Sequence, residues 1–484
     1  MRKFRLLAAS AALVLPLASA FAESATPEGA KSIEQDYAAF LTQAVIDTGI
    51  VTVAPDNDGY LVTWDLQKAA DLGGLEGAVK IDSMSYRLVP GPAGAWTLRG
   101  DHLPQISFDV PTPNGQTTGA FDFHGVGVDG VYDPMAREFL RSRLGIESME
   151  GAFKVGDAGR QSRVKIAEEG LVVEARAIPS ADDDGVDLAI AEALKSMRET
   201  ASAPSGEGED DAQMNYGVSG TVAGATFTGL RASEIAALWR SFAAHIDADQ
   251  RPPAIRERLL AALPFWNQLR AHAEISDVSV ETPQGGARMK TLQESLDLTG
   301  LTRKGEAEIA LAIQDMTLKS DLLPPWSGEL WPATLSLDVI ATGEGWDKAA
   351  RLAIDDPDFL ADGALSADTQ DKIGEVLTSG EPKLVLKPGH LKIPTIDLAF
   401  EGEAHIEGAQ PAGRLKISAD SLDKTIALLQ EMAKDDASLT PAILGVTLLK
   451  GLATTNAEGR LVWDIVATAD GDLTVNGAPL PRGQ

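Results

Sequence analysis

The chain contains no cysteine among its 484 residues. This absence excludes thiol catalysis, cysteine-based metal sites and the attachment of lipid to an N-terminal cysteine. A missing disulfide framework does not argue against export, because a chain of this length can bury a core without covalent crosslinks.

Clusters of basic residues are also missing. The 42 Lys and Arg residues are outnumbered by 71 Asp and Glu residues, so the net charge is −29. Binding to nucleic acid or to an anionic membrane surface requires clustered positive charge. The composition therefore excludes both partners and indicates a well-solvated surface.

Catalytic signatures are scarce. The sequence has no Gly-x-Ser-x-Gly elbow, no Walker loop, no dinucleotide fingerprint and no His-Glu-x-x-His. The stretch from Ser421 to Lys424 matches Ser-x-x-Lys, but a helix cap is favoured there. None of the six histidines has a second histidine at ligand spacing. We therefore predict no catalytic, metal or cofactor residues, although two carboxylates brought together in space would escape this search.

Residues 1–22 resemble a secretory signal peptide. Arg2, Lys3 and Arg5 precede an apolar run that is too short to span a bilayer, and Ala20-Phe21-Ala22 is a cleavage site. No later stretch is long and apolar enough for a transmembrane helix. We expect cleavage after Ala22 and a periplasmic mature protein.

A six-residue phrase recurs at Ile81–Tyr86, Ile275–Val280, Ile313–Leu318 and Ile393–Leu398. Each copy reads apolar, polar, polar, apolar, polar, apolar, so the alternation expected of a strand slips by one residue. An inserted residue that returns both halves to one face is what a β-bulge supplies. We therefore predict four bulged or bent strands.

Most of the remaining pattern indicates strands, with helices between them. Amphipathic helices are predicted at 31–47, 186–199 and 422–433, and a hairpin at 50–64. A further helix over 440–451 is apolar nearly all round, so we expect it to be buried. The predicted class is α+β and β-rich: extended, twisted antiparallel sheets of bent strands, with amphipathic helices packed on one face.

Residues 200–212 contain no large apolar side chain and several acids. Such a segment is typical of a flexible linker, or of a solvated loop inside one body. We take it as the boundary between an N-terminal β-rich half, 23–199, and a C-terminal half with helices, 213–484.

One loop combines rigidity with large apolar side chains. Leu323, Trp326, Leu330 and Trp331 lie among prolines that prevent a regular element. This loop is a candidate interface for a partner. The alternative is that it lies tucked over the core.

The closing stretches Gly459–Trp463 and Asp470–Gly477, with the signal peptide and the bent-strand phrases, resemble domain-of-unknown-function family 2125. This is a family of uncharacterised bacterial envelope proteins. A more distant similarity is to AsmA-like and YdgA-like periplasmic proteins. The resemblance implies an extended sheet with helices on one side and no known catalytic residues. The AsmA-like relatives imply handling of lipids along an apolar groove of the sheet.

We therefore expect a non-enzymatic periplasmic protein that binds lipid or another apolar ligand on a curved sheet, in envelope maintenance. A structural or partner-docking envelope protein is the alternative. A secreted hydrolase with spatially assembled carboxylates ranks last.

Overall fold

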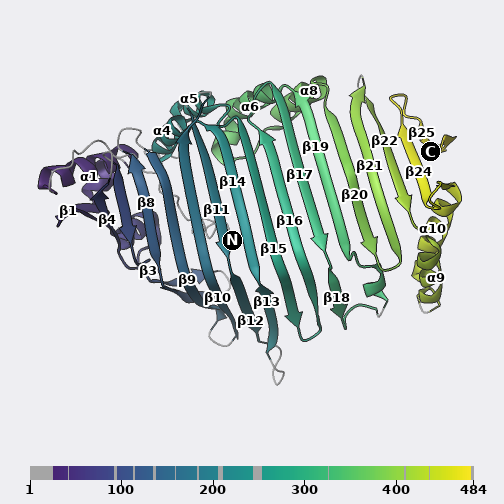
Figure 1. Ribbon diagram of the computed structural model, residues 1–484, viewed down its shortest axis with the longest axis horizontal. Coiled ribbons are helices and arrows are strands. Elements are labelled where there is room, and N and C mark those ends of the chain that lie inside the picture. Colours follow the sequence, from purple (N-terminus) through teal and green to yellow (C-terminus); the bar gives the residue numbers. More distant parts are fainter. Residues whose placement is uncertain are drawn as a thin grey trace. The chain divides into compact units, whose positions relative to one another are not determined.

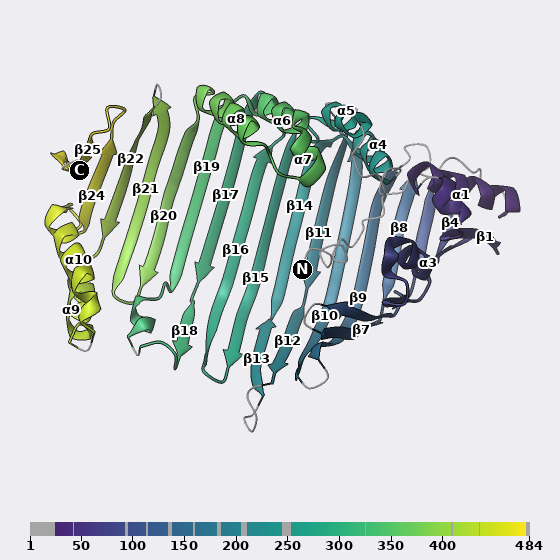
Figure 2. The same ribbon diagram turned by 180° about the vertical axis from the view of Figure 1, so that it is seen from behind.

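The computed structural model describes residues 25–41, 43–91, 95–112, 115–133, 138–157, 160–181, 185–204, 211–243, 253–324, 326–407, 410–434 and 436–480. The chain forms two compact units, Met1–Ala262 and Leu263–Gln484, here called unit 1 and unit 2. Figures 1 and 2 show the ribbon coloured along the sequence, from purple at the N-terminus to yellow at the C-terminus. The predicted signal peptide, 1–22, lies outside the described residues.

Unit 1 is built mainly from strands. They are β1 (Val51–Asp56), β2 (Gly59–Trp64), β3 (Val79–Ile81), β4 (Met84–Pro90), β5 (Trp96–Gly100), β6 (Ile106–Thr112), β7 (Gly115–His124), β8 (Gly127–Asp133), β9 (Glu138–Asp157), β10 (Arg160–Pro179), β11 (Val186–Leu194), β12 (Ser196–Ala203), β13 (Ala212–Val218) and β14 (Gly220–Leu230). Its helical segments are α1 (Pro27–Leu41), α2 (Gln43–Asp47), α3 (Leu66–Ala70), η2 (Asp71–Leu75), α4 (Ala232–Ala243) and α5 (Pro253–Ala262).

All the pairings within unit 1 described below are antiparallel. The long hairpin of β9 and β10 lies at the centre. Two shorter strands, β7 and β8, pair with β9, and two others, β11 and β12, pair with β10. The sheet continues through β5, β4, β2 and β1 beyond β8, and through β6 and β3 beyond β7. On the other side β14 follows β11 and β13 follows β12.

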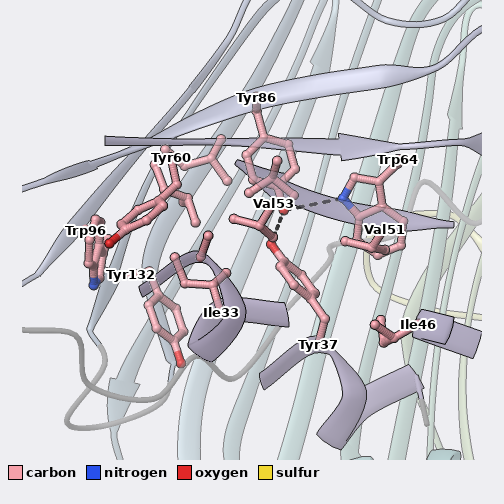
Figure 3. Packing of buried hydrophobic residues seen from close by; sticks show 14 of the residues in the cluster. Ile33, Tyr37, Ile46, Val51, Val53, Tyr60, Trp64, Tyr86, Trp96 and Tyr132 are labelled. Atoms are coloured by element: carbon pink, nitrogen blue, oxygen red, sulfur yellow. Dashed lines mark hydrogen bonds between the residues drawn. The ribbon is translucent and has the colours of Figure 1, made fainter. Parts of the chain in front are cut away.

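A cluster of buried residues in unit 1 lies between α1 and strands β1, β2, β4 and β5 (Figure 3). Tyr37 of α1 hydrogen-bonds through its hydroxyl to that of Tyr86, and its ring meets the Trp64 ring edge to face at 5.6 Å. At the outer strand of this region, the Val53 N–H donates to Glu34 Oε1 at 3.0 Å. A helix side chain thus satisfies a strand-edge donor that would otherwise be open to another strand.

Unit 2 is likewise strand-rich. Its strands are β15 (Gln268–Thr282), β16 (Gly285–Thr299), β17 (Lys304–Gln314), β18 (Thr317–Ser320), β19 (Thr334–Glu344), β20 (Lys383–Ile393), β21 (Ile396–Glu407), β22 (Gln410–Ala419), β23 (Thr454–Thr455), β24 (Leu461–Ala467), β25 (Leu473–Val475) and β26 (Ala478–Pro479). Its helical segments are η4 (Ser327–Leu330), α6 (Trp346–Asp355), α7 (Pro357–Asp362), α8 (Ala367–Ser379), α9 (Asp423–Met432), η5 (Ala437–Leu439) and α10 (Thr440–Leu452).

The sheet of unit 2 is an antiparallel series in the order β15, β16, β17, β19, β20, β21, β22, β24, β25. Helices α6 to α8 occupy the connection from β19 to β20, and α9 and α10 the connection from β22 to β24. Asp356 fixes the first connection, because its carboxylate accepts from the N–H groups of Asp358, Phe359 and Ser366. The predicted β-rich α+β class is therefore confirmed.

The predicted helix over 186–199 is wrong, because these residues form β11 and β12. Their Ala, Leu and Glu content favours a helix locally. The segment pairs instead with β10 along its whole length, and β11 also pairs with β14. These long-range pairings outweigh a weak local propensity.

Of the prediction of four bulged or bent strands, the bulges are wrong, whereas two of the copies do bend. Asp277 lies inside β15 with φ 48°, but the register with β16 is the same on both sides of it, so no residue is inserted. Asp315 (φ 51°) separates β17 from β18, which pair with β16 in one continuous register. The first copy of the phrase separates β3 from β4, and the fourth contains the turn between β20 and β21. The alternation slips because the chain kinks or turns.

The 200–212 segment does not separate the two compact units, which meet between Ala262 and Leu263. Residues up to Ala203 belong to β12, and β13 begins at Ala212 and pairs with β12. The segment is therefore a hairpin connection inside unit 1, the alternative that the composition left open. Residues 205–210 lie outside the described part of the chain.

Candidate functional site

The strand register of unit 2 brings apolar residues from distant parts of the sequence into rows. Directly opposed residues of an antiparallel pair share a face, so a row can be followed from strand to strand. One row is Leu269, Leu298, Ala307, Ala341, Leu384, Ala404, Gly413, Ala467 and Leu473. The next row on the same face is Ala271, Leu296, Ile309, Val339, Leu386, Gly402, Leu415, Ile465 and Val475. We call the surface formed by these two rows the apolar face.

The residues between these two rows point to the opposite side of the sheet. They are Arg270, Asp297, Glu308, Ile340, Val385, Glu403, Arg414, Val466 and Thr474. This polar face carries cross-strand ion pairs, such as Arg270 with Asp297 at 2.9 Å. Its charged side chains interact favourably with water or with each other. The two apolar rows do not, and contact with another apolar surface would stabilise them.

Strand β20 contains a β-bulge whose lysine side chain lies on the polar face. The register with both neighbouring strands shifts at Lys387 and Pro388, where a proline can occupy an interior strand. Lys387 Nζ lies 2.6 Å from Glu308 Oε1 and 3.1 Å from Asp338 Oδ2. The hydrogen bonds that Lys387 donates to these two carboxylates raise its pKa above the ordinary value. The bulge therefore directs a charge away from the apolar face.

The apolar face is only partly covered. Ile309 is 59% exposed and Leu384 is 47% exposed, although each is surrounded by apolar residues of its row. Most of the other side chains in the two rows are half-buried, the value expected from contact with neighbours in one layer. A contiguous apolar surface left open to water marks a site of interaction.

A shallow depression with a volume of about 320 Å³ lies on this face. Its apolar lining comes from β20 to β24 and includes Leu384, Leu386, Ala404, Leu415 and Ile465. Two glycines of the same rows, Gly402 and Gly413, lack side chains where their neighbours have them, and this lowers the floor.

Helices cover only the margins of the apolar face. A cluster that includes Trp463, Ala419, Ile396, Val446 and Leu452 packs α10 onto the last strands, next to the depression. At the other margin the Trp346 ring of α6 lies over Gly305, where a Cβ atom would come within 1.8 Å of it. In Figure 2, none of the helices α6 to α10 of unit 2 crosses the middle of strands β15 to β21. The open part therefore lies between two helical margins.

One carboxylate adjoins the apolar rows. Glu294 of β16 is opposed by Ala273 and Leu311, which lie on the same side of the sheet as the apolar face. It is exposed, with Leu292 and Leu296 two residues away on either side along its strand. A polar group bound on this part of the sheet would meet a hydrogen-bond acceptor there.

The predicted interface loop is partly covered. Trp326, Leu330 and Trp331 are half-buried, with η4 against β18, whereas Leu323 is exposed. The Trp331 Nε1 atom is buried and has no hydrogen-bond partner among the described residues. The structure thus places the two tryptophans toward the protein and leaves Leu323 as the candidate contact. This loop contributes no residue to the apolar rows. The rows themselves could not be predicted from local sequence, because they depend on the register between strands.

Within the part of the chain that the structure describes, no group of three or more His, Asp or Glu residues is arranged to hold a metal ion. In the same residues, no helix is both long enough and apolar enough to cross a membrane. Comparison with protein-family models, with curated proteins and with solved structures gives no match. The resemblance to family 2125 therefore stays a prediction.

Proposed function

We propose that unit 2 binds hydrocarbon chains, such as those of a lipid, on the apolar face. The observation that supports this function is the pair of uninterrupted apolar rows, which cross every strand of the series from β15 to β25 and remain partly open to water. Covering such a surface with an apolar ligand stabilises the complex by about 25 cal/mol for each Å² removed from water.

The dimensions of the face favour an elongated ligand. Neighbouring strands lie about 4.8 Å apart, so the rows run for roughly 38 Å from β15 to β25. The depression occupies only the β20 to β24 part of this length. A chain bound across the strands would therefore lie in the depression and extend over Val339 and Ile309.

A fluorescent long-chain fatty acid is the direct probe. Leu384→Glu places a charge in the depression, and we expect the affinity for the probe to fall about tenfold or more, because an unpaired charge would be desolvated. Val466→Glu is the matched control. It lies on the polar face, opposite Arg414, which already pairs with Asp464, so a carboxylate there adds a charge beside a cation and away from the apolar face.

Equal affinity of the two variants and the parent protein would overturn the proposal. Circular dichroism of each variant separates lost binding from lost folding. Native mass spectrometry of protein purified from its own compartment gives a second reading, since a bound hydrocarbon adds a defined mass.

The same proposal includes export to the periplasm. It is supported by the pattern at residues 1–22. Sequencing the N-terminus of the protein made in its own cell tests it. We expect the mature chain to begin at Glu23, and an intact Met1 would contradict export by this route.

Docking of an envelope protein is the second candidate function, and the exposed leucines of the predicted interface loop favour it. Leu322 is 77% exposed beside Leu323, on a loop held by η4. A photo-reactive amino acid at position 322 should cross-link to a partner in the envelope. The same group at Leu72, an exposed leucine of unit 1, should not. Equal cross-linking at both positions would count against a specific binding site for a partner at this loop.

A further inference from the structure

Helix α10 presents leucines to water. Leu444 is 67% exposed, Leu448 is 66% exposed and Leu449 is also largely exposed. Leu444 and Leu448 are four residues apart, so they lie on one side of the helix, together with the exposed Pro441. The prediction that this helix is buried is wrong, because the sheet covers only one of its sides.

The opposite side of α10 is fixed to unit 2. Val446 and Leu452 pack in the cluster around Trp463. The Trp463 Nε1 group donates to the Leu449 carbonyl at 2.7 Å. Lys450 forms an ion pair with Asp423 of α9. These contacts set the rotation of the helix about its axis, so the outward position of Leu444 and Leu448 is a property of the fold.

The composition of the segment is unusual for this chain. Residues 437–457 contain one charged side chain, Lys450, in a protein with a net charge of −29. Since Lys450 is paired with Asp423, the outward side of α10 offers a partner neither charge nor many hydrogen bonds. A partner with a polar or charged docking surface would lose hydration here without compensation.

We propose that the outward side of α10 docks on the surface of an uncharged lipid bilayer. This inference rests on the proposed function. A ligand with a long hydrocarbon chain is held in aggregates rather than free in water, so a protein that binds it must meet a bilayer or micelle. The inner side of α10 packs against the same strands that line the depression, and the outer side is the apolar surface adjoining it.

Electrostatics selects the kind of bilayer. Anionic lipids would repel a protein of charge −29, and α10 has no basic cluster to offset this. We therefore expect binding that is strongest to vesicles of phosphatidylcholine alone, and that weakens as phosphatidylglycerol is added.

Vesicle flotation of the full-length mature protein tests the proposal. The variant Leu444→Gln/Leu448→Gln should bind phosphatidylcholine vesicles about tenfold less, because two apolar anchors are lost. Both side chains are mostly exposed, so the fold should be retained. Leu72→Gln, at a leucine of unit 1 that is 63% exposed, is the matched control and should bind as the parent protein does.

Three results of the flotation assay would overturn the proposal: no binding of the parent protein to either vesicle, equal binding of the double variant, or stronger binding to anionic vesicles. Conversion of a dimer to a monomer by the double variant would also overturn it, by assigning α10 to a second copy of the chain. Binding of the fluorescent fatty acid from solution keeps the two proposals apart. The double variant should still bind the fatty acid. If the parent protein does not bind the fatty acid, the result counts against the apolar face and not against α10.

Discussion

Because only one side of α10 packs against the sheet, substitutions on its two sides should differ greatly in their effect on the free energy of unfolding. Trp463 is 6% exposed and belongs to the cluster against which Val446 of the helix packs, and its indole N–H donates to the Leu449 carbonyl. Trp463→Ala removes both the packing and the hydrogen bond. We expect it to reduce the free energy of unfolding of unit 2 by about 3–5 kcal/mol.

Two further variants separate the contributions. Trp463→Phe keeps much of the volume but leaves the Leu449 carbonyl without its donor, which costs about 1–3 kcal/mol. Leu448→Ala, on the exposed side of α10, should change the stability by less than about 0.5 kcal/mol.

Hydrogen exchange is the suitable assay, because the chain has two compact units and need not unfold in one step. Amides of β24 and α10 should exchange faster in Trp463→Ala and at the parent rate in Leu448→Ala. Similar rates in these two variants would refute the reasoning, since they would mean that α10 is not seated on Trp463.

Three other predictions concern both units. Gly119→Ala should destabilise unit 1 by about 1–3 kcal/mol in chemical denaturation, because a Cβ atom there would lie 2.6 Å from the Phe108 ring; an unchanged midpoint would contradict this. Burial raises the pKa of Tyr37, so the stability of unit 1 should fall as the pH rises above about 10, where the unfolded tyrosine ionises. Tyr37→Phe should make this alkaline decline less steep, and an identical decline would count against it. Hydrogen bonds from Ser366 and its neighbours lower the pKa of Asp356, so its contribution is present above about pH 4 and lost as the pH falls. Asp356→Asn should speed amide exchange over 357–366 at neutral pH and reduce its acid dependence; exchange that is unchanged at both pH values would sink this role.

Local patterns predicted the parts of the fold that short-range interactions decide. The helix and hairpin at residues 31–64 follow from apolar periodicity and from the turn residues Pro55 to Gly59, and the structure confirms both as α1, α2, β1 and β2. The β-rich class follows from alternating strands with one apolar side. Each of these signals is complete within a few residues.

Long-range pairing decided the rest. Residues 186–199 alternate as a strand as well as they repeat as a helix, and only their partners β10 and β14 settle the choice. The apolar face joins Leu269 to Leu473, and its rows exist only in the register of strands far apart in the chain. Which side of α10 faces the sheet likewise depends on its contact with Trp463, a residue that follows the helix in the sequence.

Photo-cross-linking with a diazirine-labelled fatty acid tests the central claim most directly, because peptide mass spectrometry reports the labelled side chains. We predict adducts at alternating positions of β17 and β20, including Ile309, Leu384 and Leu386, and none at Glu308 or Val385. Labels confined to the polar face, or spread equally over both faces, would contradict binding of hydrocarbon chains by the apolar face of unit 2.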